Sequence, residues 1–488
     1  MTRQPGLLQD TLMQVEPLGV LALALGLLGW IMRPAVAIHV FIVSTLLGAG
    51  AALILTSLGS ANLQPAHLLL ALLAASFAIK RENLGTAAPS LVFPREGFWL
   101  LLTAVYGTLA AIFFPRLLAG STYVFAIART EVGPGIVLTP LAPTSGNITQ
   151  SVYFIGDVIC FLIFYAEACR PAGLRTMTQA ILACTAINLI FAALDLATFW
   201  TGTSDMLAFM RNASYRMLDD AVVVGFKRIV GSFPEASSFA YATVGLFAFC
   251  LKLWLANLYP RSAGALAAVS FLALVFSTSS TGYAGTAGVV AVIYLLSVAQ
   301  IVNGPVPKPT LAFAVGLPFI AMSLVLSLAL YEPAWLLIQD MIDKTIVNKL
   351  ASDSGIERTM WNHQAVINLI DTAGLGAGVG SVRASSFPLA VLGNIGAFGA
   401  LTYAAFLCCI FFRRQQRGGN AYSLAVRSAA RSACLAQLLA ASVAGSFIDL
   451  GLPFFVFAAV ACARPEAVRA SRSSLATLRS GGTSEVPA

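Results

Sequence analysis

The sequence is poor in charged residues. Only 10% of the 488 residues are Asp, Glu, Lys or Arg, whereas 58% are hydrophobic. Soluble globular domains carry about 25% charged residues, so this composition excludes an ordinary soluble enzyme and is typical of a protein that lies in a bilayer. The formal net charge of +8 would indicate nucleic acid in a soluble protein. Here much of it falls in short connections between apolar runs, where it reports membrane topology, and we expect no nucleic-acid partner.

The motifs of several enzyme classes are also missing. The chain holds three histidines, and it contains no HExxH, no paired DxD, no GxSxG and no Walker motif. The eight cysteines form no CxxC pair and no ligand spacing with the histidines. The series "GLGAGVGS", residues 374–381, resembles GxGxxG, but an amphipathic helix precedes it where a dinucleotide site needs a strand. We therefore expect neither a metal nor a nucleotide cofactor.

Apolar runs near the length of a membrane-spanning helix, about 20 residues, follow one another along the chain. They predict an all-α polytopic membrane protein with about 12–14 transmembrane helices, forming a single integral membrane domain over residues 1–488. The candidate spans are 17–32, 35–58, 66–79, 97–115, 151–168, 176–199, 237–258, 263–279, 283–302, 310–331, 386–412, 432–448 and 451–463.

The connections between these runs alternate in character. One set is basic, and the positive-inside rule assigns it to the cytoplasm together with the tail 464–488. Three long connections, 116–150, 200–236 and 332–385, then face outward. The first is rich in Gly, Pro and Thr and predicts irregular backbone. The other two carry arginines against the topology rule, which indicates a functional reason for them.

The stretch "SGIERTMWNHQ", residues 354–364, gathers ionisable side chains and predicts a helix. Arg358 and His363 are five residues apart, about 140° around that helix, so they cannot easily address one substrate atom. Arg358 shares a face with Asn362 and is a functional candidate, the alternative being a salt bridge with Glu357. His363 falls in an apolar stripe formed by Ile356, Met360, His363, Ile367 and Ile370. We expect His363 to pack or to form an interfacial hydrogen bond rather than to act on the substrate.

Two further segments place polar groups beside a span. "KRIVGSFPEASSFA" sets Arg228 and Glu235 on either side of a turn, with a helix expected to begin near Pro234 and to hold Glu235 in its first turn. The acid either complements the helix dipole or serves as a general base at the membrane face. "GAGVGSVR" predicts either a turn whose amides approach an anion, with Arg383 beyond it, or a plain loop.

The segment "FSTSSTGYAG", residues 276–285, supplies hydroxyls and small residues at a span end, for helix packing or for lining a polar cavity. The candidate groups outside the spans are mainly arginines plus one or two acids. Guanidinium binds phosphate oxygens bidentately and stays charged, so this set suits an anionic, lipid-linked substrate.

Four stretches make the chain resemble the O-antigen ligase and polymerase superfamily, and most closely the Wzy-type exopolysaccharide polymerases. They are "PTSGNITQSVYF", "RIVGSFPEASSFA", "STSSTGYAG" and "RTMWNHQAVINLIDTAGLGAGVGSVRASS". Their order and spacing, together with the number of spans and the two late outer loops, carry the resemblance over most of the chain.

The resemblance implies an inverting, metal-independent glycosyltransferase of GT-C architecture in the bacterial inner membrane, with its active site facing the periplasm. Such an enzyme transfers a growing glycan from undecaprenyl pyrophosphate to a lipid-linked repeat unit, among membrane lipids and beside a chain-length regulator and a flippase. It implies pyrophosphate binding by Arg228, Arg358 and Arg383, with Arg358 also catalytic and Glu235 as our choice of base. Further candidates near the substrate are Asn147, Gln150, Asn362, His363, Ser385 and Ser386.

One departure from the family pattern bears on the activity. Ligases carry a His-Asn pair after the glycine-rich turn, where this chain has "SVRASSFPLAVLGN", which favours a polymerase over an O-antigen or glycan ligase. A polytopic transporter is the alternative from another class. It predicts internal repeats and charges buried within spans, for which Asp157 and Asp195 are the obvious acids although no repeat is visible. A purely structural membrane subunit is the remaining alternative.

Overall fold

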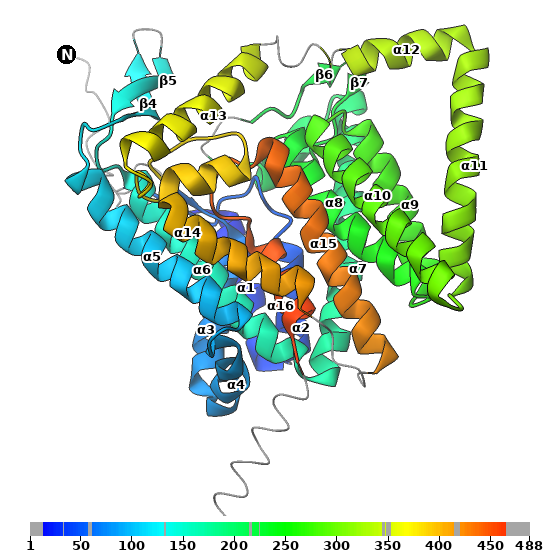
Figure 1. Ribbon diagram of the computed structural model, residues 1–488, viewed down its shortest axis with the longest axis horizontal. Helices are drawn as coiled ribbons and strands as arrows, with labels where there is room; N and C mark the ends of the chain where they lie inside the picture. Colours follow the sequence, from blue (N-terminus) through cyan, green and yellow to red (C-terminus); the bar gives the residue numbers. More distant parts are fainter. Residues whose placement is uncertain are drawn as a thin grey trace, which may run out of the picture.

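The chain folds into a bundle of helices with very little sheet, seen in a computed structural model (Figure 1). The structure describes residues 13–464 except 33, 57–60, 131–132, 214–216, 224, 344–346, 348–352 and 414–419. The longer helices are α1 (Pro17–Met32), α2 (Pro34–Ser44), α3 (Pro65–Ile79), α5 (Glu96–Leu117), α6 (Ser145–Ala168), α7 (Pro171–Thr201), α8 (Ala236–Leu255), α9 (Pro260–Phe276), α10 (Ser280–Asn303), α11 (Lys308–Leu330), α12 (Glu332–Ile342), α13 (Asp353–Asp371), α14 (Phe387–Phe412), α15 (Ala421–Ala444) and α16 (Leu452–Cys462). The shorter elements are α4 (Arg81–Ala87), η2 (Ala88–Leu91), η3 (Ser204–Met210), β1 (Gln14–Val15), β2 (Leu53–Leu55), β3 (Ala61–Leu63), β4 (Tyr123–Thr130), β5 (Gly133–Pro140), β6 (Val222–Val223) and β7 (Phe226–Lys227).

Seven of the described helices are long and apolar enough to cross a membrane, namely α5, α6, α7, α8, α10, α11 and α14. The chain is therefore a multi-pass membrane protein, as its composition predicts. Among the described residues, fewer helices than the expected 12–14 are long enough to cross a membrane. Several of the predicted spans correspond to shorter apolar helices such as α2 and α16, each of 11 residues, and a helix of that length rises only about 16 Å against a core of about 30 Å.

The predicted span 35–58 is wrong in its second half. Helix α2 ends at Ser44, and the chain then enters strand β2, which pairs antiparallel with β3 and β1. Two glycines allow the tight path between them, because a Cβ at Gly48 would lie 2.6 Å from the Phe233 ring and one at Gly50 would lie 2.5 Å from Leu18. A continuous helix would lose this close packing.

The glycines and prolines of the segment 116–150 predict irregular backbone. Much of the segment instead forms the hairpin β4–β5, with Tyr123 opposite Pro140. The first strand, "YVFAIART", is rich in the β-branched and aromatic residues that favour strands. The prolines of the second strand are tolerated because a two-stranded sheet leaves both strands at an edge.

Small residues bring the central helices together. Helix α8 is the most enclosed of the seven candidate spans, since 78% of its most apolar 18-residue stretch is buried. It packs against α9, α10 and α15. On α10, a Cβ at Gly282 would lie 3.1 Å from Ala240 of α8, and one at Gly285 would lie 3.1 Å from Ala440 of α15. The "FSTSSTGYAG" segment therefore serves helix packing, one of its two expected roles.

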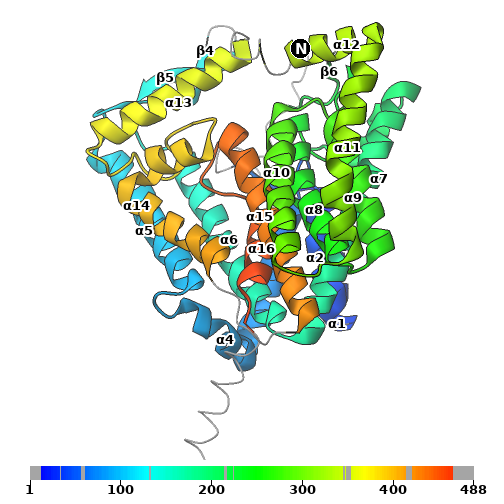
Figure 2. The ribbon, with the colours of Figure 1, turned by 45° about the vertical axis from the view of Figure 1, so that its right-hand side comes forward.

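The two ends of the bundle differ in character. The hairpin β4–β5, the strands β6–β7 and helices α12 and α13 gather at one end, here called the loop end, and α4 lies at the other (Figures 1 and 2). Helix α11 stands at the edge of the bundle, with only 6% of its most apolar window buried. The loop end is where the sequence candidates meet.

Candidate functional site

Arg228 lies between β7 and α8 at the loop end, with its backbone held on both sides. Its N–H donates to the Ala221 carbonyl over 3.0 Å, and its carbonyl accepts from Lys227 Nζ over 3.1 Å. Burial lowers the pKa of Arg228, Glu235 nearby opposes this, and the charge of Arg358 lowers the pKa further. The Arg228 Nε is buried and has no partner among the described residues. The guanidinium thus keeps hydrogen-bonding capacity for an anion.

Glu235 stands at the start of α8 as its N-cap residue, since the helix begins at Ala236. The expectation that Pro234 starts the helix and that Glu235 lies in its first turn is therefore off by two residues. The Glu235 carboxylate is half-buried and accepts a hydrogen bond from the Ser237 hydroxyl. A negative charge at this end of a helix is stabilised by the helix dipole. The same carboxylate lies in electrostatic range of Arg228, so it is the acid of this group.

Helix α13 turns its apolar stripe outward, so His363 is not packed inside the protein, which was one of its two expected roles. Ile356, Met360 and Ile370 are 49%, 51% and 69% exposed, and His363 is exposed beside them. The opposite face is buried and consists of Trp361, Ala365, Asn368 and Thr372.

Arg358 lies on the inner side of the same helix. It is half-buried, whereas His363 is exposed, so the two side chains address different surroundings, as their helix angle predicts. Arg358 is in electrostatic range of Arg228, although the two belong to widely separated loops. The fold brings these two arginines and Glu235 into one group.

Arg383 joins this group through an aromatic ring. Its guanidinium carbon stands 4.6 Å from the centroid of the Trp361 ring, and Trp361 follows Arg358 by about one helical turn. Burial lowers the pKa of Arg383, which nearby Glu357 opposes, and the Arg383 Nε is buried without a partner among the described residues. Trp361 is thus a platform that the sequence analysis did not single out as a site residue. We call Arg228, Arg358, Arg383 and Glu235 the arginine cluster.

The sequence suggested that amides of the glycine-rich turn before Arg383 approach an anion. Three of these amides are bonded within the protein instead. The Gly376 N–H donates to the Thr372 hydroxyl over 3.0 Å, and the Ala377 and Gly378 N–H groups donate to the carbonyls of Gly393 and Asn394, each over 2.9 Å. Those carbonyls belong to α14. These three donors are already bonded inside the protein, so an amide cradle for an anion cannot include them.

The glycines instead allow very close backbone packing. Helix α14 is kinked at Gly396, whose φ is 61°, and a Cβ at that residue would lie 2.2 Å from the Gly374 carbonyl oxygen. A Cβ at Gly380 would lie 2.3 Å from the Gly146 carbonyl oxygen of α6. The turn therefore fills the kink of α14 and fixes the base of the loop that carries Arg383.

Two asparagines fasten the same loop. Asn147 is buried, and its Nδ2 donates to the Val379 carbonyl over 2.7 Å and to Ser381 Oγ over 2.8 Å. Asn362 Oδ1 accepts from the backbone N–H of Ser385 over 2.8 Å. Both residues therefore hold the loop that carries Arg383 in position. Of the other candidates, Ser385 is buried and Gln150 and Ser386 are half-buried.

A second charged group, which the sequence analysis did not assemble, lies directly behind Arg228. Asp195 near the end of α7 accepts from Arg211 over 2.6 Å and from Lys227 over 3.1 Å. Its other oxygen accepts from the backbone N–H groups of Val230 over 2.8 Å and Gly231 over 3.2 Å. Asp195 therefore binds both flanks of the short segment that carries Arg228.

Asp219 completes this group, which we call the Asp195 cluster. Its carboxylate pairs with Arg211 over 3.2 Å, and its carbonyl accepts from Lys227 Nζ over 2.6 Å. The one signal in the sequence is Asp195 itself, an acid within a predicted span. Its partners lie in a loop, at spacings that no local pattern connects.

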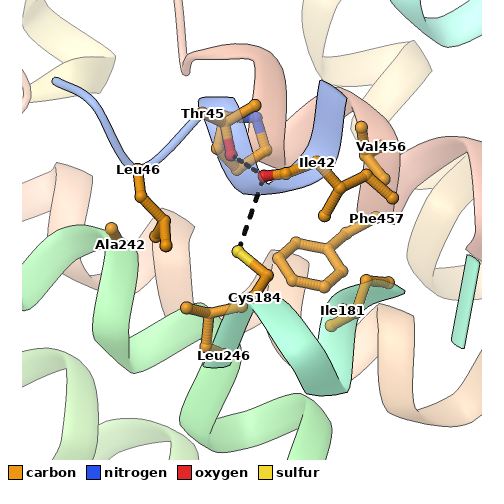
Figure 3. A pocket seen from close by; sticks show the side chains of 10 residues that line it. Ile42, Thr45, Leu46, Ile181, Cys184, Ala242, Leu246, Val456 and Phe457 are labelled. Carbon is orange, nitrogen blue, oxygen red and sulfur yellow. Dashed lines mark hydrogen bonds between the residues drawn. The ribbon is translucent and has the colours of Figure 1, made fainter. Parts of the chain in front are cut away.

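The pocket in Figure 3 is a different place with a different chemistry. It lies between α2, α7, α8 and α16 and is lined mainly by apolar side chains, while the thiol of Cys184 donates to the Ile42 carbonyl over 3.5 Å. No charged residue lines it, so it does not fit an anionic ligand. Within the described part of the chain, no group of three His, Cys, Asp or Glu side chains is placed to hold a metal ion.

Comparison of the chain with protein-family models, with curated proteins and with solved structures found no match.

Proposed function

We propose that this protein is a polysaccharide polymerase that transfers a growing glycan from undecaprenyl pyrophosphate to the non-reducing end of a lipid-linked repeat unit. The reaction is inverting and needs no metal. The site would face the outer side of the bacterial inner membrane, and a chain-length regulator and a flippase would act beside it. The family resemblance supplies the substrate, and the arginine cluster supplies the physical support.

One observation carries the proposal: the arginine cluster has hydrogen-bond donors without a partner among the described residues. Three guanidiniums from two loops gather at one end of a membrane bundle, with Glu235 near Arg228 and Glu357 near Arg383. Two of the three have a buried Nε without a partner among the described residues. Guanidinium is the side chain best suited to bind phosphate oxygens in pairs. A pyrophosphate offers several such oxygens and a charge opposite to that of the cluster.

The proposed chemistry is a single displacement. A hydroxyl of the acceptor repeat attacks the anomeric carbon of the donor glycan, the bond from that carbon to the pyrophosphate oxygen breaks, and Glu235 takes the proton of the hydroxyl. The electron pair leaves with undecaprenyl pyrophosphate, whose increasing negative charge Arg228, Arg358 and Arg383 stabilise. Attack from the face opposite the leaving group inverts the anomeric configuration.

The decisive experiment is deletion of the gene followed by analysis of lipid-linked glycans. Loss of a polymerase leaves single repeat units on undecaprenyl pyrophosphate at the outer face. Loss of a ligase leaves finished polymer on the lipid, and loss of a transporter leaves its cargo on the cytoplasmic side. Either of the last two results would contradict the proposal, and re-expression of the intact gene should restore long polymer.

A further inference from the structure

A third polar group lies inside the membrane bundle, away from both clusters at the loop end. Asp157 follows Ser145 by twelve residues on the 24-residue helix α6, about 18 Å along its axis and near its middle. The side chain is fully buried, and neither carboxylate oxygen has a hydrogen-bond partner among the described residues. An ionisable residue inside a membrane span indicates a functional site whose partner has to be found.

That partner is Asp449, on the non-helical link between α15 and α16. The carbonyls around it are held by other helices: Tyr403 donates to Ile448 over 3.1 Å, Tyr241 to Leu450 over 2.7 Å, and the Cys160 thiol to Leu452 over 3.8 Å. Irregular backbone at membrane depth is tolerated where protein encloses it or where it lines a cavity, and discontinuous helices of this kind hold coupling ions in transporters.

The two carboxyls are close to each other. Cys160, which reaches the link, is one helical turn after Asp157, so both project from the same face of α6. The Asp157 and Asp449 carboxyls lie within hydrogen-bonding reach of each other. One Asp449 oxygen already accepts from the Gly451 N–H over 2.5 Å. Because ionised carboxylates only accept hydrogen bonds, no bond can join the pair unless a proton lies between them.

One further group faces the pair. His67 on α3 lies in electrostatic range of Asp449, and its buried Nδ1 has no partner among the described residues. The titratable groups around the two carboxyls are His67 on α3, Cys160 on α6, Tyr241 on α8 and Tyr403 on α14. None of them is a lysine or an arginine, so no permanent cation among them balances two negative charges.

We propose that Asp157 and Asp449 form a proton-binding site in the interior of the membrane bundle, in which the two carboxyls share one proton beside His67. Two adjacent carboxylates cannot both be ionised in such surroundings without a compensating cation. A proton needs only the two facing oxygens, whereas hard metal cations take about six or more oxygen ligands. Here the carbonyls of Ile448, Leu450 and Leu452 already accept hydrogen bonds from side chains. Asp449 and His67 are half-buried, whereas Asp157 is fully buried.

The test is infrared spectroscopy of the purified full-length protein in lipid nanodiscs at neutral pH. A protonated-carboxyl band that shifts in heavy water should be present. Asp157→Asn should remove it, and Asp449→Asn should shift its frequency, because the fully buried Asp157 keeps its proton but changes its hydrogen-bond partner. Each variant should fold, because the new amide supplies the hydrogen bond that the proton supplied. Asp220→Asn, at an exposed position, is the matched control and should leave the band unchanged. Neither variant requires the polymerase reaction, so failure here is separate from failure of the proposed function.

A band that survives in Asp157→Asn would overturn the proposal. A band that appears only when sodium is replaced by choline would also overturn it, since the pair would then hold a metal cation. If both variants fail to fold, the wild-type protein provides the same test. Its band and its melting temperature should decline together as the pH rises, because the proton that joins α6 to the α15–α16 link is lost. A melting temperature that stays constant while the band disappears would contradict the inference.

Discussion

The arginine cluster and the Asp195 cluster are neighbours at the loop end, and they use charge in opposite ways. In the Asp195 cluster, Asp195 and Asp219 face Arg211 and Lys227, and the pairs lie within 3.2 Å. In the arginine cluster, Glu235 and Arg358 each lie in electrostatic range of Arg228, and Arg383 joins through Trp361. The Nε atoms of Arg228 and Arg383 have no partner among the described residues. One group is balanced and closed, and the other has an excess of positive charge and free donors.

This difference separates support from function. A balanced, buried ion network keeps a backbone in place, and nothing in it is left to bind a ligand. An unbalanced group held near a membrane surface costs stability on its own and is favourable only when an anion completes it. The Asp195 cluster holds the segment on which Arg228 stands, so the closed group positions one member of the open group.

The largest expected effect is on stability in the closed group. Asp195→Ala removes the carboxylate that pairs with buried Lys227 and leaves Arg211 with only the half-buried Asp219 as a counter-charge. We expect it to lower the free energy of unfolding by about 3–5 kcal/mol. Thermal or denaturant unfolding of the purified protein measures this. Asp220→Ala, at an exposed position, should change the same quantity by no more than about 0.5 kcal/mol. Wild-type stability of Asp195→Ala would mean that the two clusters do not differ as described.

The next effect is on activity in the open group. Arg358→Ala should reduce polymer formation about 100- to 1,000-fold, the usual loss when one donor to a developing negative charge is removed. Its free energy of unfolding should change by no more than about 1 kcal/mol, since no buried ion pair is broken. Polymer yield and accumulated single repeats, normalised to protein level, check the first part. A stability loss as large as that of Asp195→Ala would place Arg358 in a structural role.

A smaller effect is expected at Arg383, where lysine separates charge from shape. Lysine keeps the charge but loses the planar stacking on Trp361 and the paired contact with phosphate, so Arg383→Lys should be impaired nearly as badly as Arg383→Ala. A lost hydrogen bond to a charged group costs about 1.5–3 kcal/mol, roughly 10- to 100-fold in rate. Near-normal polymer from the lysine variant would eliminate paired phosphate binding at this position.

The smallest effect is predicted for His363, which lies on the outward stripe of α13. His363→Ala should retain most of the polymer yield and change the free energy of unfolding by no more than about 0.5 kcal/mol. It is the matched control for Arg358→Ala on the same helix. Loss of polymer in both variants at equal expression would show that α13 does not keep the two side chains apart.

The sequence alone determined the membrane class and the long helices, because the length and apolarity of a run decide whether a helix can cross a bilayer. It also determined that Arg358 and His363 diverge, because helix geometry fixes angles between residues close in the chain. The closeness of Arg228 to Glu235 is local in the same sense.

Only the tertiary structure decided what distant segments do to one another. By its sequence, the stripe on α13 could have packed inward. Amides of the glycine-rich turn could have bound an anion, but carbonyls of α14 accept hydrogen bonds from two of them. Asp195 acquired Arg211 and Lys227, Arg383 acquired Trp361, and Asp157 met Asp449 through the fold. The physical reason is the same in each case. A charge or a backbone donor is satisfied by whichever group the fold brings within about 3 Å, and a local pattern contains no information on which group that will be.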